Sequence, residues 1–141
     1  MQQTPVAPSA ASTGAEDSPV SPPAEIAGAL LTVTEQCVGR RAVLSVAGEV
    51  DMSTAAELRT AIETAASRAF EVWVDLSDTT FMDSSGLHAM AQSRAHLAGA
   101  NIRLALICTE GPVLRVIKLA GFDRIFEIHP TRSDANYAAN A

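Results

Sequence analysis

Lysine is nearly absent from this sequence. Lys118 is the only one, and the 10 Lys and Arg residues face 16 Asp and Glu residues, which gives a formal net charge of -6. The arginines are scattered singly, apart from Arg40 and Arg41. A surface of this kind repels phosphate backbones and anionic headgroups. We therefore expect neither nucleic acid nor a membrane among the partners.

Long apolar runs are missing too. The longest mostly apolar stretches, residues 26–33 and 104–108, fall well short of the roughly 20 residues that a membrane helix needs. No Lys or Arg precedes Arg40, so the N-terminus lacks the cationic start of a secretory signal or transit peptide. These absences predict a cytoplasmic protein.

Cysteine is scarce, and glycine-rich nucleotide loops are absent. Cys37 and Cys108 lie far apart without metal-ligand spacing, which argues against a disulfide framework and a zinc site. We expect two partly buried thiols in a reducing compartment, with a redox-sensing pair as the alternative. Because neither G-x-x-x-x-G-K-[ST] nor G-x-G-x-x-G occurs, we expect no bound cofactor.

The length of 141 residues, 48% of them hydrophobic, suits one globular domain. Residues 1–27 contain five prolines among Ser, Thr and Ala, and they can bury too little apolar surface to order themselves. We predict a disordered tail over 1–27 and a single domain over 28–141.

After the tail, short apolar runs alternate with helical patterns. Residues 30–33 and 43–46 predict a hairpin that ends near Gly48. Thr54 and Glu57 have the spacing of a capping box, and apolar residues continue from there at helical spacing to Ala66. Further strands are predicted over 72–76, 102–107 and 125–128, and further helices over 87–97 and 112–120.

Glycines and a proline mark the ends of these later helices. Gly99 and Gly121 can stop the second and third helices, and Pro112 suits the first turn of the third. Residues 133–141 form a weak Ala-rich helix at best. The alternation predicts an α/β fold: a mixed central sheet of about five strands with about four helices packed on it, and parallel neighbours wherever a helix crosses between strands.

The most informative segment follows the strand at 72–76. A short loop with Phe81 and Met82 leads to D-S-S-G-L over 83–87, at the start of a helix. A serine there can be a simple N-cap. It can also be a phosphoacceptor, because a phosphate at a helix N-terminus meets free N–H groups and the positive end of the helix dipole. Gly86, lacking a side chain, would let a partner's backbone come close.

Residues 81–87 (FMDSSGL) resemble the phosphorylation-site signature of the STAS family, the domain shared by anti-sigma factor antagonists and sulfate transporter tails. Residues 48–51 (GEVD) with Thr54, and residues 119–126 (LAGFDRIF), resemble the same family in the expected order. The resemblance covers about residues 30–130, nearly all of the chain expected to be ordered.

The resemblance implies a STAS fold and a partner switch in a bacterial stress response. The unphosphorylated protein would bind an anti-sigma factor, usually also an ATP-dependent serine kinase, and so free a sigma factor for transcription. A serine phosphatase would reset the switch. The phosphoacceptor would be the first of the paired serines, Ser84, rather than Ser85, which we expect to cap the helix. Any nucleotide would arrive bound to the kinase, and we expect a monomer when free.

The predicted partner-binding residues surround this serine and include the loop before the first helix. They are Glu49, Asp51, Ser53, Asp83, Ser84, Ser85, Gly86, Leu87 and His88. A phosphate adds about -1.5 to -2 charges to a surface that already holds Asp51, Asp78 and Asp83. A loss of roughly 3 kcal/mol would weaken binding about a hundredfold. Glu49 and Asp51 could equally form a solvated turn, and Asp83 could position the hydroxyl or serve as a turn residue. His88 could alter kinase recognition or make binding depend on pH.

Three other functions are compatible with parts of this sequence. An enzyme using Ser84 or Ser85 with His88, His96 or His129 as base is disfavoured because the motif is not the G-x-S-x-G elbow. A phosphoaspartate receiver needs a lysine after a late strand, but Lys118 lies in the third predicted helix. A STAS scaffold in a stress-signalling assembly, or a subunit of a lipid or anion transport complex, stays open because fold alone does not decide function.

Overall fold

The computed structural model describes residues 31–133, so the predicted tail at 1–27 and nearly all of the weak helix predicted at 133–141 lie outside it. The elements follow in the order β1 (Leu31–Val38), β2 (Arg41–Val50), α1 (Ala55–Ala66), β3 (Glu71–Asp75), β4 (Thr79–Met82), α2 (Ser84–Gly99), β5 (Arg103–Ile107), α3 (Pro112–Leu119), the 3-10 turn η2 (Phe122–Arg124) and β6 (Glu127–His129).

The sheet is mixed, as predicted. Its order is β1-β2-β3-β5-β6, with β4 paired to β2. β1 and β2 form the predicted antiparallel hairpin, and Gly39 takes a φ of 61° in its turn, a left-handed conformation that glycine adopts without strain. All other pairings are parallel, because a helix or a longer connection separates the paired strands in the chain.

Two strands differ from the prediction. β4 was expected to be a loop, yet Phe81 and Met82 pair with Glu49 and Val50 of β2 in the space beyond the end of β3. The last strand is shorter than predicted because the backbone N–H groups of Ile125 and Phe126 both bond to the Phe122 carbonyl and close a turn. Residues 31–133 contain three complete α-helices, and the weak helix that completes the expected four, at 133–141, lies almost wholly outside the described residues.

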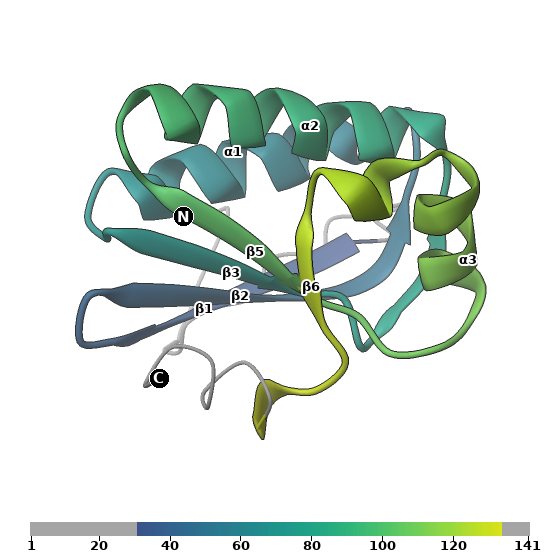
Figure 1. Cartoon of the computed structure of the whole chain (residues 1–141), viewed down its shortest axis with the longest axis horizontal. Coiled ribbons are helices and arrows are strands. Elements are labelled where there is room, and N and C mark those ends of the chain that lie inside the picture. Colours follow the sequence, from purple (N-terminus) through teal and green to yellow (C-terminus); the bar gives the residue numbers. More distant parts are fainter. Residues whose placement is uncertain (1–30, 134–141) are drawn as a thin grey trace, which may run out of the picture.

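The helices α1 and α2 lie side by side on one face of the sheet, and α3 lies near one end of it (Figure 1). Between helices and sheet is the main core, to which Leu44, Val46, Leu58, Ile62, Val74, Met90 and Leu106 contribute fully or almost fully buried side chains. A smaller cluster of Val43, Trp73, Ala105 and Ile107 is separate from it. Within the described range, no helix has the length and apolar character to cross a membrane.

Candidate functional site

The starts of α1 and α2 meet at one edge of the sheet. Val50 and Met82 are register partners at the ends of the parallel strands β2 and β4, and the Asp83 backbone N–H donates to the Val50 carbonyl over 3.2 Å. Both connections therefore leave the sheet at the same place. This arrangement brings the loop before α1 next to the serines at the start of α2.

Asp83 is the N-cap of α2. Its Oδ1 accepts hydrogen bonds from the backbone N–H groups of Ser85 (2.8 Å) and Gly86 (3.4 Å). The expectation that Ser85 caps the helix was therefore wrong, because Ser85 lies inside the first turn. A carboxylate at this position is favoured by the helix dipole. It also occupies N–H groups that were expected to be free for a phosphate.

Ser84 is the first residue of α2 and its side chain is exposed. Among the described residues its hydroxyl has no hydrogen-bond partner, so it is open to another molecule. Ser85 is only half-exposed. His88 is exposed and lies four residues after Ser84, hence on the same side of the helix. Of the two serines, Ser84 is the more accessible.

Gly86 and Leu87 point inwards. A Cβ built on Gly86 would lie 2.7 Å from Val50 Cγ1 and 2.9 Å from Met82 Cγ. The glycine thus lets α2 pack closely against β2 and β4, which corrects the expectation that it admits a partner's backbone. Leu87 is 4% exposed and belongs to the core. Both residues shape the site from beneath.

The loop before α1 is held by its own side chains. Asp51 Oδ1 accepts from the backbone N–H of Ser53 (2.9 Å) and from its hydroxyl (2.7 Å), and these hydrogen bonds lower the pKa of Asp51. The Thr54 hydroxyl donates to the Glu49 carbonyl (2.8 Å) and accepts from the Asp51 N–H (3.0 Å). The predicted capping box with Glu57 is therefore absent, since α1 has no side-chain cap. The loop presents a fixed, ionised Asp51.

Two apolar side chains near these acids were not predicted from the sequence as partner-binding residues. Met52, in the loop, is 84% exposed, and Phe81, the register partner of Glu49, is 46% exposed. Exposed large apolar residues at a candidate site favour a protein partner. The position of Phe81 beside Glu49 depends on the β2–β4 pairing, which no local pattern indicated.

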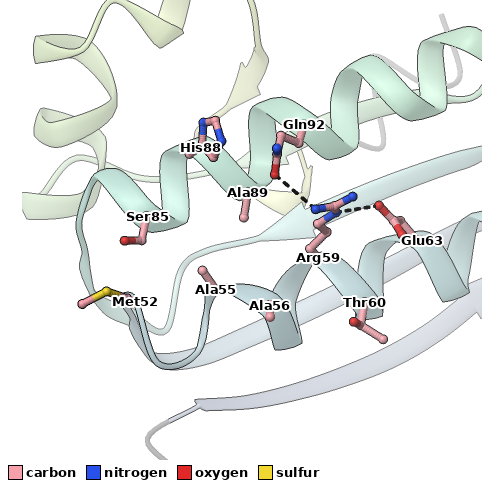
Figure 2. A pocket seen from close by; sticks show the side chains of 10 residues that line it. All are labelled: Met52, Ala55, Ala56, Arg59, Thr60, Glu63, Ser85, His88, Ala89 and Gln92. Carbon is pink, nitrogen blue, oxygen red and sulfur yellow. Dashed lines mark hydrogen bonds and ion pairs between the residues drawn. The ribbon is translucent and has the colours of Figure 1, made fainter.

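A groove of about 500 Å³ opens between α1 and α2 and begins beside Ser85. Figure 2 shows Met52 and Ser85 near one end, with side chains from both helices along its length. Arg59 of α1 joins its two walls, because it donates to Gln92 of α2 (3.3 Å) and to Glu63 of its own helix (3.0 Å) (Figure 2). Sequence reasoning missed this groove, since no motif reports which faces of two helices meet.

The described residues show no metal-ligating cluster of three or more His, Cys, Asp or Glu. Cys108 is buried, which raises its pKa to about 11. Cys37 is exposed, contrary to expectation, and its hydrogen bond to Glu35 raises its pKa. Both thiols are thus held away from the reactive thiolate form.

This chain is similar to known proteins in both sequence and fold. The protein-family model of the STAS domain matches residues 30–135. The anti-sigma-F factor antagonist RsfB of Mycobacterium tuberculosis is 34% identical over 106 residues, which cover 74% of this chain and 86% of RsfB. The crystal structure of an anti-sigma factor antagonist from Mycobacterium paratuberculosis has a TM-score of 0.72 and 30% identity, covering 79% of this chain and 95% of that one.

The Bacillus cell fate determinant SpoIIAA in its phosphorylated form has a TM-score of 0.58 and 19% identity, covering 76% of this chain and 99% of that one. At that identity the likeness concerns the fold alone. The family match spans all of the described residues, and the predicted resemblance to the STAS family is thereby confirmed. The chain belongs to the STAS domain family.

Proposed function

We propose that this protein is an anti-sigma factor antagonist controlled by phosphorylation of Ser84. Unphosphorylated, it binds an anti-sigma factor that is also a serine kinase, and so releases a sigma factor. Phosphorylation by that kinase ends the binding, and a serine phosphatase restores it. The protein acts in the cytoplasm and is a monomer when free.

The observation that carries the proposal is the accessibility of the Ser84 hydroxyl. Its hydroxyl is exposed at the first residue of α2 and lacks a partner within the described residues. A kinase needs this access to transfer a phosphate. The names of the mycobacterial relatives support the partner class, because both are anti-sigma factor antagonists.

The neighbouring charges support the direction of the switch. Asp83 adjoins Ser84, and the loop before α1 places Asp51 at the same edge of the sheet. Because Asp83 already accepts from two N–H groups of the first turn, a phosphate on Ser84 is only partly neutralised by the helix start. The phosphate's charge of about -1.5 to -2 therefore acts on a partner bound at this surface. A cost of roughly 3 kcal/mol would weaken the complex about a hundredfold.

The proposal is tested with purified anti-sigma factor kinases of the source species. Wild-type protein and the Ser84→Ala and Ser85→Ala variants are incubated with kinase and ATP, and the phosphate is mapped by mass spectrometry. We expect Ser84 to be modified in wild type and in Ser85→Ala, and no phosphate in Ser84→Ala. A phosphate on Ser85 alone rejects Ser84 as the acceptor and assigns that role to Ser85. No phosphate with any such kinase rejects the switch and favours the scaffold or transport-subunit alternative.

Calorimetric titration of the same kinase completes the test. Ser84→Ala should bind like wild type, whereas Ser84→Asp should bind at least about tenfold more weakly, because only the added charge disturbs the contact. Equal affinity of the two variants would refute the charge mechanism.

A further inference from the structure

The groove between α1 and α2 is continuous with the proposed phosphorylation site. Ser85 lines its end, and Met52 beside it is 84% exposed. At this end Ala55, Ala56 and Ala89 contribute only methyl groups, and the one large side chain that a helix adds beside Ser85 is His88 of α2. Small side chains allow another backbone to approach closely, and Met52 adapts to varied apolar surfaces. The shape suits a helix lying along α1 and α2.

The polar groups of the groove are rich in donors. The Arg59 side chain is 48% exposed, and of its five N–H donors it uses one at Nε for Glu63 and one at Nη1 for Gln92. The Thr60 and Ser85 hydroxyls and the Gln92 amide N–H groups add further donors. Glu63 is the one carboxylate lining the groove, and Arg59 already engages it. An incoming acceptor, above all a carboxylate, matches this lining.

We infer that the groove seats an amphipathic helix of the anti-sigma factor, with a carboxylate directed at Arg59 and apolar side chains against Met52 and the alanines. This inference rests on the proposed function and names the chemistry of the partner. It also explains how the switch reaches the interface: a phosphate on Ser84, next to Ser85 at the end of the groove, repels an acidic helix and blocks its seating.

Charge reversal at Arg59 tests the inference. The full unphosphorylated chain is titrated calorimetrically against the purified anti-sigma factor kinase used above. Arg59→Glu should weaken binding at least about tenfold. Arg94→Glu is the matched control, because Arg94 is an exposed arginine of α2 that does not line this groove. It should change the affinity less than about twofold.

Steric filling gives a second, independent variant. Ala56→Gln places a longer side chain in the groove and should weaken binding about tenfold, while Ala95→Gln on an exposed part of α2 outside the groove should not. Circular dichroism of each variant checks that it is folded. Replacing acidic residues of the kinase's helices by lysine, one at a time, should identify one position that restores the affinity of Arg59→Glu.

The outcomes separate this inference from the proposed function. If wild type binds the kinase but Arg59→Glu and Ala56→Gln bind equally well, the helix lies elsewhere and only the groove inference falls. If no lysine substitution restores binding to Arg59→Glu, the carboxylate contact is rejected. If wild type binds no anti-sigma factor at all, both proposals fail together. A groove variant that alters self-association in sedimentation measurements, without affecting kinase binding, would assign the groove to a second copy of the chain.

Discussion

The first turn of α2 places three polar residues in a row, and each has a different task. Asp83 accepts hydrogen bonds from two backbone N–H groups of the turn, Ser84 is exposed to solvent, and Ser85 borders the groove. The motif indicated this candidate site, but the sequence could not say which of the three residues caps the helix. Any of them can accept an N–H bond, and shifting the helix start by one residue changes the answer. Thr54 shows the same ambiguity, because its hydroxyl bonds within the loop rather than to α1.

The cap assignment leads to a stability prediction. Asp83→Ala should lower the free energy of unfolding by about 1 kcal/mol, since two N–H groups lose their acceptor. Asp83→Asn keeps an acceptor oxygen and should lose less. Urea unfolding followed by circular dichroism measures both. Asp78→Ala is the control, because Asp78 is exposed and its side chain has no partner among the described residues. Equal unfolding midpoints for Asp83→Ala and Asp78→Ala would contradict the cap.

At the scale of elements, periodicity predicted well where a segment was long or bounded by clear signals. The helices α1, α2 and α3 and the strands β3 and β5 lie where the apolar spacing placed them, and Pro112 opens α3 as expected. β4 was not predicted, because its four residues are too few to show an alternating apolar pattern. It also pairs with β2 only where β2 extends past β3. That pairing is a non-local fact. It nevertheless sets the position of the candidate site.

The packing of α2 on this pair of strands depends on Gly86. A methyl group there would lie 2.7 Å from Val50 Cγ1, closer than carbon atoms tolerate. Gly86→Ala should therefore lower the free energy of unfolding by about 1–3 kcal/mol, despite the better helix propensity of alanine. Gly99→Ala, in the same helix with nothing within 4 Å of the new methyl, should be neutral or stabilising. Denaturant titration compares the two. If both variants gain stability, α2 packs differently from this description.

For the whole molecule, alternating strands and helices were enough to predict an α/β layer, and the family resemblance indicated where the candidate site lies. The groove could not be predicted, because it depends on the relative rotation of α1 and α2. The contacts made by the chain after β6 could not be predicted either. Arg132 reaches back to the Asp75 carboxylate at the end of β3 (2.6 Å) and to the Ser45 hydroxyl on β2. Ion pairs so distant in sequence leave no local signal.

The ion pair between Arg132 and Asp75 makes the stability of the fold depend on pH. Burial raises the pKa of Asp75, but hydrogen bonds from Ser77 and Arg132 outweigh burial and leave its pKa below the ordinary value. The folded state therefore binds the Asp75 proton more weakly than the unfolded chain does. The carboxylate contributes its full stability above the unfolded pKa of about 3.9, and this is lost as the pH falls through the lower folded pKa.

Asp75→Asn should remove that part of the pH dependence. At pH 7 the variant should be less stable than wild type by about 1–3 kcal/mol, because hydrogen bonds to a charged group are lost. Because the variant has no carboxyl group to protonate, its deficit should shrink as the pH is lowered from about 5 to about 2. Urea unfolding at each pH measures this. Asp78→Asn, at an exposed carboxylate without a side-chain partner in residues 31–133, should follow the wild-type curve throughout. A constant deficit for Asp75→Asn at every pH would show that Arg132 holds the chain end by packing and not by charge.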